Sequence, residues 1–175
     1  QFVKLRAAQR EPTHWGLDGT CPIVPLLGRL EANDRALCVG TASEAPAYLL
    51  SSHDVDVIYW APDAGLAERI EQRSITEQLS ARVYTLVAQL CSWVPATPGP
   101  FDIILIDMAV LADLDIDSRY EVLRSLQERT REQGLHVLLP SPTLVPEAVF
   151  TYYDGWKREQ PPRRQQTTSA RIRDA

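Results

Sequence analysis

The sequence predicts an α/β protein built on a doubly wound, mostly parallel sheet. Short apolar runs rich in β-branched residues alternate along the chain with longer amphipathic segments, which is the pattern of successive βαβ units. The 175 residues are 45% hydrophobic and 23% charged. That is ordinary globular composition, and a chain of this length buries roughly two-thirds of its unfolded surface. We therefore expect one domain over residues 21–175, preceded by an arm without a clear pattern at residues 1–20.

Five strands are expected in the parallel part of the sheet. The clearest is Phe101–Asp107, which is apolar, branched and bounded by turn residues. The other four are Arg35–Gly40, Val55–Trp60, Arg82–Val87 and Gly134–Leu139. Near the C-terminus, Trp156–Glu159 and Thr167–Arg173 are expected to form an antiparallel pair that closes the sheet.

The segments between the strands show helical spacing. In Asp117–Gln133, the apolar residues Val122, Leu123 and Leu126 recur on one face. Further helices are expected at Cys21–Leu30, Ser43–Ser52 (with Ser43 as N-cap), Asp63–Leu79, Leu90–Thr97 and Val145–Tyr153. Right-handed crossovers would place these helices on both faces of the sheet and leave a ligand crevice at the carboxyl ends of the strands.

Composition argues against several classes of protein. The longest apolar runs are far shorter than the roughly 20 residues that span a bilayer, so no membrane segment is expected. The three cysteines lie far apart, and neither they nor the three histidines show metal-ligand spacing. Such cysteine usage favours an intracellular location, cytoplasmic or organellar. The chain starts at Gln1 instead of Met and is basic up to Arg10, so a removed mitochondrial targeting segment is one option.

Charge is unevenly distributed along the chain. The formal net charge is −5, but the residues from Trp156 onward carry +4 and the remainder carries −9. A basic end of this kind can dock on RNA phosphates or on an acidic protein partner, and it can equally be a solvated final strand and tail. Its basic residues are Lys157, Arg158, Arg163, Arg164, Arg171 and Arg173.

The stretch Ala36–Glu44 has the form of a nucleotide-binding loop that has lost most of its glycines. An apolar run leads into Gly40, as a buried strand leads into a tight turn, but Ala42 and Glu44 follow where such loops need glycine. A phosphate or a cofactor carboxylate beside Glu44 would meet a like charge.

From about His14 to its end, the chain resembles the class I S-adenosylmethionine-dependent methyltransferases, especially the small tellurite-resistance-type branch. The resemblance rests on the order and spacing of several short motifs. These are His14-Trp15-Gly16, the strand ending at Gly40, Phe101–Leu105, Leu111–Arg119 before a long helix, Gly134 before the fifth strand, and Tyr153–Trp156 before a basic last strand. It implies a Rossmann-like fold, S-adenosylmethionine as cofactor and methyl transfer as the activity.

The cofactor motifs depart from the family pattern. In the family, an acid ends the second strand and binds both ribose hydroxyls, and here Tyr59 stands in that place. An Asp after the third strand binds the adenine amine, and here Gln89 matches it. The cofactor-binding positions that the resemblance implies are therefore Gly40, Tyr59, Trp60 and Gln89. Tyr59 and Trp60 are bulky enough to fill the ribose or adenine space. Each lost charge-assisted hydrogen bond removes about 1.5–3 kcal/mol, and about 1.4 kcal/mol is tenfold in affinity.

A few other side chains are candidates for chemistry. Asp107 ends the fourth strand in the crevice, where it either meets a methyl acceptor or caps the next segment. His14 is either a substrate-side base or an ordinary surface histidine. His53 and His136 have the settings of structural residues.

Three functions are compatible with the sequence. The first is a methyltransferase-like pseudoenzyme, which keeps the fold as a structural or interaction subunit of a larger assembly. The second is an active methyltransferase on a small molecule or RNA, with Tyr59 against the nucleoside and Gln89 reading adenine. The third is a crevice that holds another nucleotide, although Glu44 disfavours phosphates on the first turn.

Overall fold

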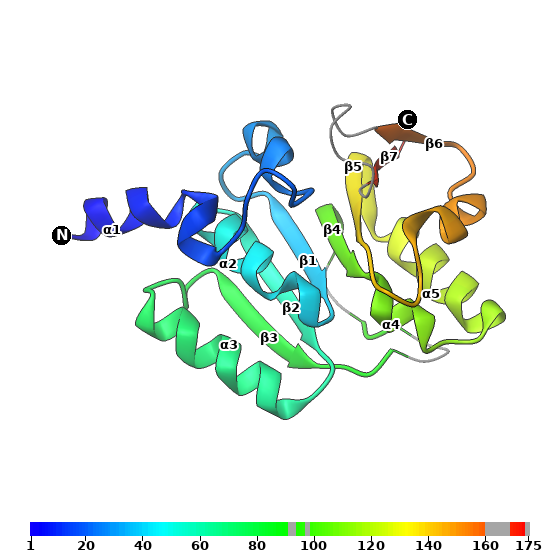
Figure 1. The fold of residues 1–175 in the computed structure, drawn as a ribbon, viewed down its shortest axis with the longest axis horizontal. Coiled ribbons are helices and arrows are strands. Elements are labelled where there is room, and N and C mark those ends of the chain that lie inside the picture. Colours follow the sequence, from blue (N-terminus) through cyan, green and yellow to red (C-terminus); the bar gives the residue numbers. More distant parts are fainter. Residues whose placement is uncertain (91–93, 97–98, 160–168, 174–175) are drawn as a thin grey trace.

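The fold, seen in a computed structural model, is a seven-stranded sheet between two layers of helices (Figure 1). The structure describes residues 1–90, 94–96, 99–159 and 169–173. The strand order is β3-β2-β1-β4-β5-β7-β6. Neighbours among the first five strands are parallel, which confirms the predicted doubly wound sheet. These strands are β1 (Arg35–Val39), β2 (Asp56–Ala61), β3 (Val83–Val87), β4 (Phe101–Asp107) and β5 (Thr130–Leu139).

The remaining two strands form the predicted antiparallel pair. They are β6 (Trp156–Glu159) and β7 (Ser169–Arg173), and β7 is antiparallel to both β5 and β6. The later strand therefore lies inside the sheet, with β6 at the edge.

Each face of the sheet carries its own apolar core, because successive side chains of a strand point to opposite faces. On β4, Ile103 and Leu105 belong to one core, and Ile104 and Ile106 to the other. The first core is covered by α2 (Glu44–Ser52), α3 (Ala64–Thr76) and the short 3₁₀ helices η1 (Pro12–Trp15) and η2 (Val24–Arg29). The second is covered by α4 (Met108–Ala112), α5 (Ile116–Glu128) and η4 (Pro146–Tyr152). Burial on both faces explains why the strands have continuous apolar runs.

The first 20 residues are more ordered than expected. They contain α1 (Phe2–Gln9) as well as η1, so the expectation of an arm without a pattern is wrong. Trp15 is only 6% exposed, and its indole nitrogen donates to the Gln9 carbonyl at 2.7 Å. Gln9 is itself buried and donates to the Glu77 carbonyl at 2.7 Å. This segment therefore packs into the core under α2.

Some element boundaries differ from the predicted ones. The helix expected to run to Gln133 ends at Glu128, and β5 begins at Thr130. A Cβ at Gly134 would lie 2.5 Å from Thr130 Cγ2, and Gln133 has a φ of 62°, where the pairing of β5 with β4 shifts register between Phe101 and Ile103 as in a β-bulge. The segments 21–30 and 145–153 form 3₁₀ helices, which begin with prolines that cannot donate backbone hydrogen bonds.

One expected helix, at Leu90–Thr97, lies partly outside the described residues. Its described residues, 90 and 94–96, are not helical.

Among the described residues, no helix combines the length and apolar character needed to cross a bilayer. The same part of the chain holds no group of three side chains suited to bind a metal ion.

Candidate functional site

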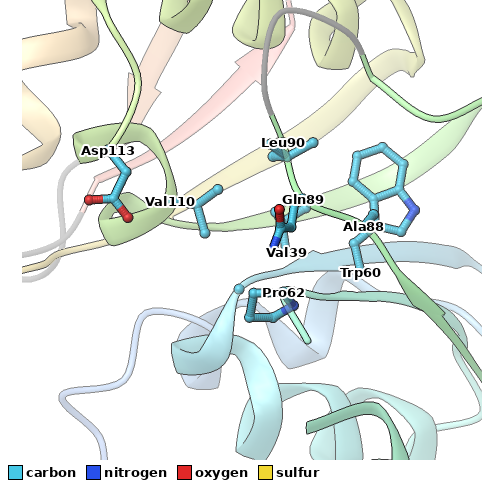
Figure 2. A pocket seen from close by; sticks show the side chains of 9 residues that line it. Val39, Trp60, Pro62, Ala88, Gln89, Leu90, Val110 and Asp113 are labelled. Carbon is cyan, nitrogen blue, oxygen red and sulfur yellow. The ribbon is translucent and has the colours of Figure 1, made fainter. Parts of the chain in front are cut away.

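The first hollow of interest lies at the carboxyl ends of the parallel strands, where doubly wound proteins bind their ligands (Figure 2). Its volume is about 260 Å³. It brings together three of the four predicted cofactor-binding residues: Gly40 after β1, Trp60 on β2 and Gln89 after β3. The other lining residues are Val39, Pro62, Ala88, Leu90, Val110 and Asp113.

Gly40 is required by the close approach of the chain after β4. Its φ is 88°, a conformation that residues with a Cβ rarely adopt. A Cβ placed there would lie 2.5 Å from Asp107 Cβ and 2.7 Å from Val110 Cγ2. The surviving glycine of the loop therefore serves the packing of β1 against the start of α4.

Asp107 lies across this turn and acts as a cap, one of the two roles weighed from sequence. It is 6% exposed. One carboxylate oxygen accepts from the Ala109 amide at 2.9 Å, at the start of α4. The other accepts from the Ala42 amide at 2.9 Å. Because Asp107 already binds the Ala42 amide, that amide is not available to an incoming anion.

Tyr59 does not line the hollow. Its side chain is fully buried in the core on the α2 face, and its hydroxyl donates to the Gly40 carbonyl. Burial raises the pKa of this phenol, so it stays neutral. The expectation that Tyr59 fills the nucleoside space is therefore not met, and stacking on a ligand would require it to leave its core position.

Trp60 points to the opposite face and forms one wall of the hollow (Figure 2). It is 1% exposed. Among the described residues, its indole nitrogen has no hydrogen-bond partner. A buried donor without an acceptor is costly, so this nitrogen is a polar group that the described residues leave unsatisfied.

The carboxylates near this hollow are placed differently from those of a ribose site. Among the described residues that line it, Asp113 is the charged one, and it lies after α4 on the far side of Val110 from Gln89 (Figure 2). Sequence reasoning missed it because the α4 helix between β4 and Asp113 was not predicted. Asp63, the acid closest in sequence to the end of β2, caps α3 by accepting from the Leu66 amide at 2.8 Å.

Glu44 faces a second hollow on the other side of the first turn. This hollow has a volume of about 420 Å³ and is lined by Thr41, Ala42, Glu44, Ala45, Tyr48, Arg69 and Arg73. The Glu44 carboxylate accepts from Arg69 at 2.6 Å and from the Tyr48 hydroxyl at 3.1 Å. Partial burial raises the pKa of Glu44, but the hydrogen bonds from Arg69 and Tyr48 outweigh it, and the net pKa is lowered. Glu44 therefore lines the second hollow and not that of Figure 2, so the expected repulsion between its carboxylate and a cofactor does not apply there.

The histidines lie away from both hollows. His14 lies 3.3 Å from a Glu77 carboxylate oxygen and against the edge of Trp15. His53 contacts the Arg10 carbonyl at 3.2 Å. His136 is fully buried, with ring nitrogens 2.7 Å from the Thr130 hydroxyl and 2.8 Å from the Tyr153 hydroxyl.

The basic C-terminal residues are only partly described. Lys157 and Arg158 lie on β6, and Arg158 is 3.7 Å from Glu147. Arg171 and Arg173 are positions of β7, while Arg163 and Arg164 lie outside the described residues. An RNA-binding role for this segment stays a prediction.

Comparisons with known proteins agree with this geometry. No protein-family model matches the sequence, and a search of curated protein sequences finds no match. Solved structures do match. A TehB-like SAM-dependent methyltransferase from Corynebacterium glutamicum aligns with a TM-score of 0.68 at 16% identity, over 99% of this chain and 98% of that one. TehB from Haemophilus influenzae aligns with a TM-score of 0.66 at 14% identity, over 87% of this chain and 61% of that one.

A third structure contains a ligand. A SAM-dependent methyltransferase from Geobacter sulfurreducens, in complex with S-adenosyl-L-homocysteine, aligns with a TM-score of 0.59 at 13% identity, over 89% of this chain and 72% of that one. The chain therefore has the fold of the class I S-adenosylmethionine-dependent methyltransferases. Among these structures, the TehB-like protein shares nearly its whole length with this chain, in line with the tellurite-resistance-type resemblance.

Proposed function

We propose that this protein uses the methyltransferase fold without binding S-adenosylmethionine, as a non-catalytic subunit of a larger assembly. The main observation behind this proposal is that side chains of the protein form hydrogen bonds with the backbone of the turn after β1. Asp107 accepts from the Ala42 amide, and the Tyr59 hydroxyl donates to the Gly40 carbonyl. Two polar backbone groups of this turn are thus bound by the protein's own side chains.

The missing ribose carboxylate supports the same conclusion. A carboxylate accepts from both hydroxyls of a diol, which a phenol cannot do. At the end of β2, Tyr59 is buried away from the hollow and Asp63 is engaged as a helix cap. The loss of about 1.5–3 kcal/mol for each charge-assisted hydrogen bond weakens binding by about tenfold to a hundredfold per bond.

The size of the hollow also argues against the full cofactor. Sites for small molecules are usually about 300–1,000 Å³, and this hollow is about 260 Å³. Asp107 and Val110 lie close to the turn at Gly40, where even an added Cβ would collide with them. The residues present therefore do not fit S-adenosylmethionine, and we derive no catalytic step through it.

The cofactor half of the proposal is tested by isothermal titration with S-adenosylmethionine and S-adenosylhomocysteine. The Geobacter sulfurreducens protein, titrated with S-adenosylhomocysteine in the same buffer, is the positive control. We expect no binding by this chain at concentrations that saturate the control. Micromolar binding would overturn the proposal.

The assembly half needs a separate measurement. Size-exclusion chromatography of extract from the native source, followed by detection with an antibody, reports the mass of the particle that holds the chain. We expect elution well above the 19.7 kDa of this sequence, together with other proteins. Elution as a free monomer would contradict this part alone.

The alternative function is an active methyltransferase with an atypical site. The observation that favours it is the Trp60 indole nitrogen, which lacks a partner among the described residues and belongs to the wall that also holds Gln89. Under this alternative, Gln89→Ala removes cofactor binding, while Gln72→Ala, an exposed position on α3, leaves it intact. Binding by the wild type that is lost only in the Gln89 variant would establish it.

A further inference from the structure

The hollow beside α3 has features of a ligand site that the methyltransferase fold does not account for. It lies on the α2 face of the sheet. One side is formed by the turn after β1 and by α2, and the other side by α3. Its volume of about 420 Å³ falls within the range of small-molecule sites. None of its seven lining residues lines the hollow of Figure 2.

Arg73 is the first element of this site. Its guanidinium lies over two aromatic rings, 5.2 Å from the centre of the Trp15 ring and 5.1 Å from that of Tyr48. Trp15 and Tyr48 are both buried and are 5.1 Å apart, so they form a fixed platform. Within the described part of the chain, no carboxylate lies at ion-pair distance from Arg73. A held guanidinium with free donors loses little entropy when it binds a planar anion.

The second element is the charge balance of the hollow. Arg69 lies one helical turn before Arg73 and is paired with Glu44 at 2.6 Å. The Glu44 carboxylate of this pair also accepts from the Tyr48 hydroxyl, so both of its hydrogen-bond partners line the hollow. The three charged lining residues therefore leave one net positive charge, which belongs to Arg73. A monoanion matches this balance, whereas a dianion would be repelled by Glu44.

The third element is the apolar floor. Thr41, Ala42 and Ala45, from the first turn and the start of α2, also line the hollow. These small side chains leave room for a compact organic body once its charged group is bound at Arg73. A planar carboxylate can accept from both parallel donors of a guanidinium.

We propose that this hollow binds the carboxylate of a small organic acid, with Arg73 as its bidentate partner and the floor of Thr41, Ala42 and Ala45 under its apolar body. This site does not depend on whether S-adenosylmethionine binds at the hollow of Figure 2. It gives the chain a small-molecule ligand even though the cofactor residues do not fit.

The test is a nuclear magnetic resonance titration of the full chain with benzoate. We expect the amides of Ala42 and Ala45 to shift and saturate at millimolar benzoate, while those of Gln89 and Val110 stay in place. Arg73→Gln is expected to weaken binding by at least about tenfold, because it removes a bidentate charged contact. Arg124→Gln, an exposed arginine of α5, is the matched control and should bind as the wild type does.

Four results would overturn the proposal. They are equal binding of the neutral analogue benzamide, unchanged affinity in Arg73→Gln, shifts confined to Gln89 and Val110, and tighter binding of inorganic phosphate than of benzoate. Arg73→Lys keeps the charge but not the planar fork, so an affinity between those of the wild type and Arg73→Gln supports bidentate binding. A thermal melt of each variant confirms that it is folded.

Discussion

A Cβ has no room at Gly40, so this position tests how tightly the first turn is packed. Gly40→Ala is expected to destabilise the fold by at least about 2 kcal/mol, from a φ of 88° and from contact with Asp107 and Val110. Chemical denaturation of both forms measures the difference.

Gly155→Ala provides the matched control for that substitution. Gly155 also has a positive φ, of 78°, but a Cβ there meets nothing within 4 Å. Both variants place a Cβ at a positive φ, and only Gly40→Ala adds the collision. Equal destabilisation of both would show that the turn yields to a larger residue.

The Glu44 carboxylate should give the stability of the protein a measurable pH dependence. Its pKa is lowered in the folded state, so its ionised form stabilises the fold above the unfolded value of about 4.3. This contribution is lost as the pH falls through the lower folded-state pKa. We therefore expect Glu44→Gln to melt at a lower temperature than the wild type at pH 7, with the gap narrowing below about pH 4.

Glu128→Gln serves as the control for this pH series. Glu128 pairs with Arg124 on the exposed side of α5, where its side chain is 65% exposed. Such surface pairs contribute little. A gap between Glu44→Gln and wild type that stays constant from pH 7 to pH 3 would contradict the role given to the Glu44 carboxylate.

At these residues, the sequence predicted roles that depend on neighbours along the chain, but not those that depend on which way a side chain points in the fold. Capping of the next segment was one of two roles that the sequence left open for Asp107 at the end of a strand, and in the structure its carboxylate caps α4. The neighbours of Glu44 depend on where α3 presents Arg69, which lies 25 residues further along the chain. For Tyr59 and Trp60, strand alternation predicts opposite faces. The sequence does not say which face carries the hollow.

Among the elements, α5 shows how a helix start is fixed by one side chain. Asp115 is its N-cap and accepts from the Ser118 amide at 2.8 Å. Asp115→Ala is expected to cost about 1 kcal/mol of stability. Asp117→Ala, in the first turn of the same helix but without the cap, should cost less, and denaturant unfolding of the two variants compares them. A larger loss in Asp117→Ala would contradict this account.

Elements with a strong pattern were predicted well, and those set by long-range contacts were not. The strands β1 to β4 lie within one residue of their expected bounds, because their apolar runs end at turn residues. The end of α5 was missed, since β5 begins at Thr130, earlier than the expected Gly134, and its pairing with β4 is irregular over its first residues. The Thr130 hydroxyl there contacts His136 six residues later, which local sequence does not reveal. The helix at the N-terminus was missed because its burial depends on Trp15 and Gln9 reaching α2 and the loop after α3.

At the scale of the whole molecule, the central strand β4 joins the two cores. Ile104 is fully buried on the α5 face and lies between Leu37 of β1 and His136 of β5. Ile104→Ala is expected to cost about 2–5 kcal/mol, from lost burial and the cavity left behind. Ile116→Ala, at a side chain that is 67% exposed, should change stability by less than about 0.5 kcal/mol. Similar unfolding midpoints for these two variants would contradict a well-packed second core.

The fold class was predictable because the alternation of strands and helices is a property of the whole chain. The chemistry of the site was less so, because it depends on which backbone groups of the first turn remain free. Asp107 and Tyr59, which occupy two of them, lie 48 residues apart in the sequence.

The position of β7 has a consequence for how the protein is made. Because β7 lies between β5 and β6, the ribosome synthesises β6 before the strand that attaches it to the sheet exists. Until residues 169–173 leave the exit tunnel, β6 has no neighbour to pair with, and the β5 side of the sheet keeps an open edge. A released chain truncated before residue 169 should therefore resist limited proteolysis from β1 to β4 while remaining cleavable at residues 156–159.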